Sequence, residues 1–204
     1  ILNNSSMFLL PIYYFLKQEC VIIPLKVIIM KKIIIYDFDG TLTPYSLPKF
    51  EILEKSGMKD GAYNPQFLEL SQKRVKDENI DLYKATYNTY FEIIKNAGFK
   101  LTDENFSIGY DNVEYNNGVT EFLSMLYQSN ISNYLLSSGL KVFLKKISIS
   151  SYFKEIYATT FTYNQDYEAT GFEFLMSDKN KVVAIKEILK KNNIDNEDCS
   201  SIIY

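Results

Sequence analysis

The sequence predicts an α/β fold in which a parallel sheet, with helices on its faces, carries an inserted helical segment. Two apolar runs lead to this prediction, because residues 33–36 and 131–136 each have the pattern of a short buried strand that ends in small polar residues. Between them, residues 47–130 space their apolar side chains mostly at helical intervals. The two strands therefore enclose a helical insertion.

Two aspartates follow the first predicted strand. The stretch KKIIIYDFDGTLTP places Asp37 and Asp39 at its carboxyl end. Because alternate residues of a strand face the same way, both carboxylates are expected to point into the crevice beyond the sheet, while Phe38 turns away and packs. Like charges this close repel each other, so either a cation lies between them or one of them holds a proton.

The turn after the aspartates suits an anion. Gly40 and Thr41 supply a tight turn with backbone N–H groups available to a phosphate, and two carboxylates suit a hard cation such as Mg²⁺. A solvated turn is the alternative, since Asp and Gly are common turn residues. Average composition gives the D-x-D-G-[S/T] pattern in a chain this long only on the order of a few times per thousand, which favours a phosphate and a metal.

Composition restricts the remaining chemistry. The chain has 204 residues, 47% of them hydrophobic and 23% charged, as expected for one domain with an insertion or for two small domains. A net charge of −3 with scattered lysines gives no basic surface for nucleic acid. Histidine is absent and Cys20 and Cys199 are isolated, which excludes His-based triads and His-rich zinc sites. Carboxylate, hydroxyl and lysine chemistry remain.

Residues 1–29 are expected to lie outside the fold. They are apolar, but prolines and charged residues interrupt them before any run approaches the ~18 residues of a transmembrane helix. They also lack the basic start and the small-residue cleavage site of a secretory signal. Met30 directly precedes the first strand, so we interpret residues 1–29 as upstream sequence, with a membrane anchor as the alternative.

Three longer helices are predicted in the insertion. The first begins at Pro65 with Asn64 as its N-cap, the second occupies residues 81–97 before a glycine, and the third runs over residues 119–126 and leads back to the sheet. The many tyrosines of this segment are interpreted as packing residues rather than binding residues.

The second predicted strand also ends in a candidate anion site. Ser137, Ser138 and Gly139 follow it, and a helix is expected to begin near Leu140. A hydroxyl beside the free N–H groups of a helix N-terminus binds anions, although serines at such positions also simply cap helices.

The rest of the chain predicts a hairpin, a helix and a final strand. Turn residues 164–166 lie between two β-rich runs, and the stretch CSSIIY begins another strand. The intervening helix has Ser177 or Asp178 as its cap. Its predicted buried face consists of Val182, Ile185, Ile188 and Leu189.

In this order the motifs resemble those of the haloacid dehalogenase-like (HAD) hydrolases. DFDGTLT is similar to the first motif of that superfamily, YLLSSG to the second, and a lysine of SDKNKVVAIKEIL to the third. The resemblance covers about residues 30–204. It implies a Rossmann-like core, formed by residues 30–46 and 131–204, and a helical cap at residues 47–130, as in phosphoserine-phosphatase-like members.

The resemblance also implies a role for each matched residue. Asp37 would be the nucleophile that forms an aspartyl-phosphate, and Asp39 would be the general acid and base. Mg²⁺ would be bound by the Asp37 carboxylate and the Asp39 backbone carbonyl. The phosphate would be bound by Gly40, Thr41, Ser137, Ser138, Gly139 and a lysine. Lys181 lies seven residues before Ile188, as the family pattern requires, and Lys179 is the less well aligned alternative.

The expected function is Mg²⁺-dependent hydrolysis of a small phosphorylated metabolite in the cytoplasm, with no nucleic-acid or membrane partner. The family's fourth motif, an acidic Gly-Asp loop, would follow SSIIY, so we expect the chain to be truncated at its C-terminus and of low activity. A phosphomutase and a non-catalytic binding module of this fold are the alternatives. A dehalogenase is disfavoured, because those members lack the second aspartate, present here as Asp39.

Overall fold

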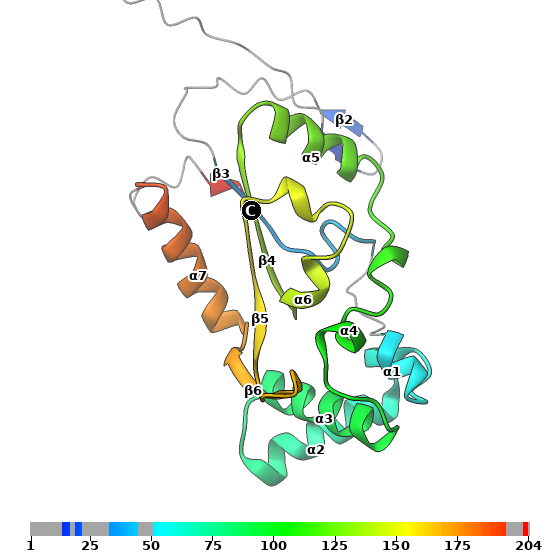
Figure 1. Ribbon diagram of the computed structural model, residues 1–204. Helices are drawn as coiled ribbons and strands as arrows, with labels where there is room; N and C mark the ends of the chain where they lie inside the picture. Colours follow the sequence, from blue (N-terminus) through cyan, green and yellow to red (C-terminus); the bar gives the residue numbers. More distant parts are fainter. Residues whose placement is uncertain (1–13, 17–18, 22–32, 45–50, 195–201, 204) are drawn as a thin grey trace, which may run out of the picture.

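The computed structural model describes residues 14–16, 19–21, 33–44, 51–194 and 202–203 (Figure 1). Within residues 1–29 the structure describes only residues 14–16 and 19–21, which form an antiparallel pair of short strands. This pair does not test the expectation that the segment lies outside the fold, which stays a prediction. The helices and strands are β1 (Tyr14–Leu16), β2 (Glu19–Val21), β3 (Ile33–Tyr36), α1 (Glu51–Lys55), α2 (Pro65–Glu78), α3 (Leu82–Asn96), α4 (Asp103–Phe106), α5 (Val119–Gln128), β4 (Ser132–Leu140), α6 (Lys141–Leu144), β5 (Glu155–Tyr163), β6 (Ala169–Phe174), α7 (Asp178–Lys191) and β7 (Ile202–Ile203).

The main sheet has five strands in the order β6-β5-β4-β3-β7. Strands β3, β4, β5 and β7 are parallel, and β6 forms the predicted antiparallel hairpin with β5. The chain moves outward from β3 through β4 to β5 and then returns to the other side of β3 with β7. The carboxyl end of β3 is therefore a topological switch point, where open α/β sheets bind their ligands.

Helices cover both faces of the sheet, which confirms the predicted fold class. Successive residues of β3 point to opposite faces. Ile33 and Ile35 pack against the apolar side of α7, and Ile34 and Tyr36 pack in a second cluster with side chains of α5. Figure 1 shows α7 on one side of β4 and β5, with α5 and α6 on the other. All four residues of β3 are buried, as a continuous apolar strand of a parallel sheet requires.

Helix α7 begins as predicted and buries most of the predicted face, with Ile185 partly buried against the core and Val182 outside it. Ser177 is its N-cap and accepts a hydrogen bond from the Asn180 amide. The buried residues are Ala184, Ile188 and Leu189, whereas Val182 is 53% exposed, so its predicted place in the core is wrong. At 3.6 residues per turn, Val182 lies about 160° around the helix from Ala184, and the small alanine defines the face that packs.

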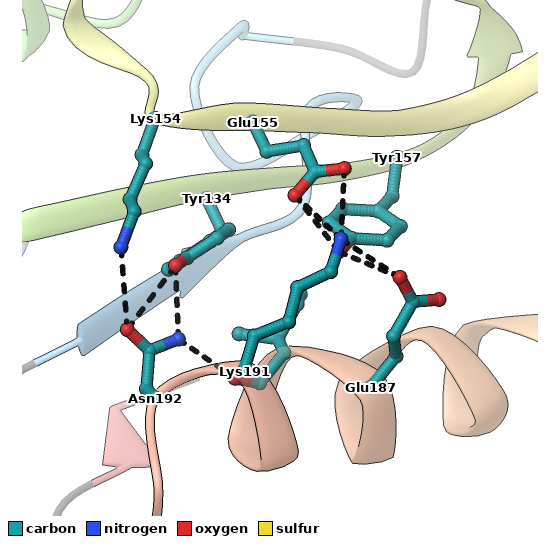
Figure 2. A network of polar contacts seen from close by, with 8 residues as sticks. Tyr134, Lys154, Glu155, Tyr157, Glu187, Lys191 and Asn192 are labelled. Atoms are coloured by element: carbon teal, nitrogen blue, oxygen red, sulfur yellow. Dashed lines mark hydrogen bonds and ion pairs between the residues drawn. The ribbon is translucent and has the colours of Figure 1, made fainter.

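The C-terminal end of α7 is fixed to β5 by a charged cluster (Figure 2). Lys191 Nζ lies 3.0 Å from Glu155 Oε2 and 2.8 Å from Glu187 Oε1, and it donates to the Tyr157 hydroxyl at 2.9 Å. Burial raises the pKa of Tyr157 to about 12, so this hydroxyl stays protonated at neutral pH.

A second group of contacts in Figure 2 ends the helix. Asn192 is buried at the C-cap, where its amide nitrogen donates to the Tyr134 hydroxyl at 2.9 Å and its oxygen lies 3.5 Å from Lys154 Nζ. Together the two groups set the position of α7 along the sheet, and with it the position of the opposite end of the helix.

An aromatic cluster joins the helical insertion to the β5–β6 hairpin. Tyr87 and Phe91 of α3 contact Phe161 of β5 and Phe172 of β6, with ring centroids 5.0–6.0 Å apart. Phe106 stacks on the same group from α4. Helix α5, the last helix of the insertion, packs with the sheet instead. The assignment of residues 47–130 to a separate helical cap stays a prediction. Over the described residues, no helix combines the length and the apolar character that crossing a membrane requires.

Candidate active site

The loop after β3 is organised around one backbone carbonyl. The Phe38 oxygen accepts hydrogen bonds from the amides of Thr41, Leu42 and Thr43 at 3.0–3.3 Å. Gly40 has φ +74°, a conformation that costs a residue with a Cβ about 1–2 kcal/mol. The Phe38 side chain is buried, as its alternation with the aspartates predicted. The loop thus bends sharply at the carboxyl edge of the sheet.

Asn116 holds this loop from the segment before α5. Its side-chain nitrogen donates to the carbonyl oxygens of Thr41 at 2.8 Å and Thr43 at 3.1 Å. Its backbone amide donates to the carbonyl oxygen of Leu42 at 2.9 Å. The sequence analysis missed this residue, because the YNNG stretch signals only a turn and not the partner of that turn. Asn116 is therefore a positioning residue for the loop that carries Asp39.

The carboxylate of Asp37 has partners in two different elements. Oδ1 accepts the Phe38 amide at 2.9 Å, and Oδ2 lies 3.1 Å from Lys181 Nζ of α7. The Lys181 side chain is 16% exposed and that of Asp37 is 27% exposed, so the attraction is less screened than in a surface pair. Lys179, the alternative lysine, is exposed, and its ammonium has no ion pair within the described part of the chain.

The predicted serines lie inside an irregular end of β4. The pairing of β4 with β5 shifts register between Leu136 and Leu140, and the short α6 follows at Lys141. The Ser137 oxygen is fully buried and accepts the Gly139 amide at 3.0 Å, which leaves the hydroxyl hydrogen for another acceptor. A Cβ at Gly139 would lie 3.2 Å from that oxygen, so glycine suits the close approach.

Two side chains from other elements meet at the carbonyl of Ser138. The Tyr87 hydroxyl of α3 donates to it at 2.6 Å, and the Thr159 hydroxyl of β5 donates at 3.1 Å. Burial, followed by the nearby charge of Asp39, holds the pKa of Tyr87 well above its usual range. Asp39 follows Asp37 by two residues in the loop after β3, at the same edge of the sheet.

The structure thus brings the first-motif aspartates, the serines of β4 and Lys181 to one edge of the sheet. Sequence reasoning missed the residues that other elements contribute, namely Asn116, Thr159, Asp178, Tyr83 and Tyr87. The spacing of the two tyrosines, four residues apart on one helix, was the available signal, but it also fits the packing role assigned to them.

The donor set at this edge suits Mg²⁺. Asp37 and Asp39 supply hard carboxylate oxygens, and Mg²⁺ is commonly bound by one or two carboxylates together with substrate phosphate and water. A cluster of three or more His, Cys, Asp or Glu side chains does not occur within the described ranges. The residues present therefore fit Mg²⁺ as a site shared with the substrate.

A separate open groove of about 520 Å³ lies between α2 and α3, with further lining residues from the α1 region and the end of α3. Its lining includes Arg74, which pairs with Glu78 and Glu92, and it includes none of the predicted site residues. Arg74 and the two glutamates of the lining are thus already paired with each other. The groove therefore gives no argument for placing the chemistry there.

The family model described as haloacid dehalogenase-like hydrolase matches residues 34–204. No curated protein matches the chain at a significant level.

Solved structures share the fold at low sequence identity. A HAD family hydrolase from Salmonella enterica subsp. enterica serovar Typhi aligns with a TM-score of 0.58 at 15% identity, over 84% of this chain and 54% of that one. A phosphoserine phosphatase, in a phospho-aspartyl intermediate analogue form, aligns with a TM-score of 0.57 at 19% identity, over 82% of this chain and 75% of that one. A substrate-bound phosphoserine phosphatase complex aligns with a TM-score of 0.57 at 18% identity, over 83% of this chain and 75% of that one. The chain thus spans about half of the first relative and three quarters of the other two.

Proposed function

Because the chain belongs to the haloacid dehalogenase-like hydrolases, we propose that it hydrolyses phosphomonoesters of small molecules through an aspartyl-phosphate on Asp37. One observation carries the proposal. The Asp37 carboxylate lies at the carboxyl end of β3, at the switch point of the sheet, with the Lys181 ammonium 3.1 Å away. An anionic nucleophile held beside a fixed cation suits attack on a phosphate ester.

In the first step an Asp37 oxygen would attack phosphorus, and the bond between phosphorus and the alcohol oxygen would break. Asp39 would give its proton to that departing oxygen, so that a neutral alcohol leaves. The Phe38 amide, bonded to Oδ1 at 2.9 Å, holds the Asp37 carboxylate in one orientation. The step thus needs no reorientation of the nucleophile.

In the second step water would attack the phosphorus of the aspartyl-phosphate. Asp39, now ionised, would take a proton from this water as the phosphorus–Asp37 bond breaks, which releases inorganic phosphate and restores the Asp37 carboxylate and the protonated Asp39. Asp39 is only partly exposed, so it would act in a partly desolvated position.

The remaining residues would hold the charge of the phosphoryl group. Lys181 would neutralise charge shared by the nucleophile and the phosphate, and the hydroxyls of Ser137 and Ser138 with the amides of Gly40, Thr41 and Gly139 would bind its oxygens. The Asp37 carboxylate and the Asp39 backbone carbonyl would hold Mg²⁺, which when bound offsets the repulsion between nucleophile and phosphate. The solved phosphoserine phosphatases of the same fold support a small phosphorylated substrate.

The test uses a generic aryl phosphate, p-nitrophenyl phosphate, with Mg²⁺. We expect wild-type protein to release inorganic phosphate, and Asp37→Asn to lose the activity by more than about 100-fold, since the amide keeps the shape but not the charge. Asp166→Asn, in the exposed hairpin turn, is the matched control and should keep full activity. A hydroxylamine-sensitive phosphoprotein should form in wild type and in Asp166→Asn but not in Asp37→Asn.

Two results would contradict the proposal. Turnover of Asp37→Asn within about tenfold of wild type, or ~1.4 kcal/mol of barrier, would remove Asp37 from the reaction. Transfer of the phosphoryl group to a second site of the substrate, without release of inorganic phosphate, would make the protein a phosphomutase instead.

A further inference from the structure

Two tyrosines of α3 reach the site from the helical insertion. Tyr83 and Tyr87 are one turn apart, so their side chains lie on the same face of the helix. The Tyr87 hydroxyl donates to the Ser138 carbonyl at 2.6 Å, and the Tyr83 hydroxyl donates to Asp178 Oδ1 at 2.8 Å. Tyr87 is 5% exposed, whereas Tyr83 is only partly buried. Tyr83 is therefore the one of the two that a ligand can reach.

The partner of Tyr83 lies on the same helix as the partner of the nucleophile. Asp178 and Lys181 are both in the first turn of α7 and are three residues apart, so they share a face. Asp178 accepts from Tyr83 of the insertion, and Lys181 pairs with Asp37 of the sheet. The first turn of α7 therefore makes both contacts, the hydrogen bond with the Tyr83 phenol and the ion pair where the phosphoryl group would bind.

The electrostatic surroundings of Tyr83 agree with this placement. Burial raises its pKa above the usual value, the hydrogen bond and the charge of Asp178 raise it further, and a hydrogen bond with the Ser138 side chain lowers it. The charge of Asp37 adds a smaller increase. The phenol is therefore a neutral donor at pH 7, and it lies within electrostatic reach of Ser138, which is proposed to bind the phosphoryl group, and of the proposed nucleophile Asp37.

We propose that Tyr83 is a substrate-binding residue, which moves its hydrogen bond from Asp178 to a phosphoryl oxygen when a phosphate ester enters the site. The inference rests on the proposed function. A phenol has a single hydrogen to donate, and a phosphate dianion beside Lys181 is an acceptor as strong as a carboxylate, so one charge-assisted bond replaces another. Asp178 holds the phenol in place in the absence of substrate.

This exchange makes a prediction that a simple structural tie does not. If the bond between Tyr83 and Asp178 only holds α3 against α7, then Tyr83→Phe breaks that bond and Asp178→Asn weakens it, and both variants change phosphate binding in the same direction. If Tyr83 gives its hydrogen bond to phosphate, Tyr83→Phe weakens phosphate binding. Asp178→Asn then strengthens it, because the competing acceptor becomes neutral and a negative charge near the phosphate is lost.

The experiment measures inhibition of p-nitrophenyl phosphate hydrolysis by inorganic phosphate, with kcat and KM for each variant. We expect the inhibition constant of phosphate to rise roughly 10- to 100-fold in Tyr83→Phe, the value of one hydrogen bond to a charged group, and to fall in Asp178→Asn. The control is Tyr127→Phe on α5, an exposed tyrosine away from the site, which should match wild type. Melting temperatures establish that the variants are folded.

A double variant separates charge from hydrogen bonding. In the Tyr83→Phe background, Asp178→Asn should tighten phosphate less than it does in wild type, because only the loss of charge remains. Equal tightening in both backgrounds, an unchanged inhibition constant in Tyr83→Phe, or weaker binding in both single variants would each overturn the role of Tyr83. Failure of wild-type protein to hydrolyse the aryl phosphate would contradict the proposed function itself, and is thereby distinguished from these results.

Discussion

Lys181 Nζ lies 3.1 Å from Asp37 Oδ2, although 144 positions separate the two residues in the chain. The contact joins the first turn of α7 to the carboxyl end of β3. Each end of α7 has its own charged attachment, because Lys191 binds Glu155 of β5 at the other end. A helix fixed at both ends places the ammonium group with little freedom, as an electrostatic catalyst requires.

The two lysines at the start of α7 should differ in their effect on catalysis. Lys181→Ala removes a partly buried cation beside the nucleophile, so we expect kcat/KM for an aryl phosphate to fall by about 100-fold or more. Lys179→Ala changes an exposed side chain and should stay within about twofold of wild type. Steady-state kinetics of the two purified variants give the comparison. The opposite ranking would assign the phosphate contact to Lys179.

Removing the side chain of Asn116 should loosen the loop that carries Asp39. Asn116→Ala deletes two hydrogen bonds to the carbonyls of Thr41 and Thr43, and we expect a loss of about 1–2 kcal/mol in the free energy of unfolding. Turnover should fall as well, because Asp39 lies on the same loop. The neighbouring Asn117→Ala, at an exposed position, is the control in urea unfolding and in kinetics. Equal behaviour of the two variants would show that the loop keeps its shape without Asn116.

Phe161 should be a major source of stability at the junction between the insertion and the hairpin. It is 5% exposed, and its ring lies 5.0 Å from the rings of both Phe91 and Phe106. We expect Phe161→Ala to lower the free energy of unfolding by about 3–5 kcal/mol. Phe174→Ala, at the partly exposed end of β6, should cost less than about 1 kcal/mol. Urea denaturation measures the free energy of unfolding of both variants. Similar losses in the two would show that Phe161 is not a major source of stability at this junction.

The ionised carboxylate of Glu187 should stabilise the folded protein at neutral pH but not at acid pH. The hydrogen bond from Lys191 holds the pKa of Glu187 below its ordinary value of 4.5. A depressed pKa means that the folded state favours the ionised carboxyl, so this contribution is complete above about pH 4.5 and is lost as the pH falls through the folded pKa. The difference in melting temperature between wild type and Glu187→Gln should therefore be present at pH 7 and decrease as the pH falls below about 4.5, until the folded carboxyl is protonated.

Salt and a second glutamate provide the controls for this prediction. Because Glu187 is half exposed, the difference at pH 7 should be small and should shrink in 1 M NaCl. Glu173→Gln changes an exposed glutamate of β6 and should show no such pH dependence. A difference between wild type and Glu187→Gln that does not decrease as the pH falls below about 4.5 would mean that the carboxyl acts through packing and not through its charge.

Local signals were sufficient for the elements and for the first-motif loop. The cap at Asn64 was predicted from residue type, and Ser177 was one of the two candidates for the cap of α7; both side chains accept an amide hydrogen bond at the helix start in the structure. The strand before Asp37 was equally visible, since its four apolar residues end at a turn glycine. Such features depend on interactions between residues two or three positions apart, which a single sequence contains.

Residues that act across the fold could not be found in this way. Asn116 and Tyr83 bind partners 75 and 95 positions away, and their own neighbours in sequence give no sign of those partners. The exposed Val182 shows the same limit within one helix, because periodicity finds an apolar face but the sheet decides which face is buried. Contacts between residues far apart in the chain, such as those that position the loop, could therefore be found only from the three-dimensional structure.

The central position of β3 in the sheet has a consequence for the order of folding. Ile33 pairs with Ser132 of β4 on one side and with Ile202 of β7 on the other, so each pairing closes a loop of about 100 residues or more. The hairpin of β5 with β6 closes far shorter loops and is expected to form earlier. The strand that precedes Asp37 leaves the ribosome before its partners, yet pairs after them. Pulse-labelled hydrogen exchange should show the β3 amides protected later than those of β5, and until then β4 keeps an open edge that other chains can join.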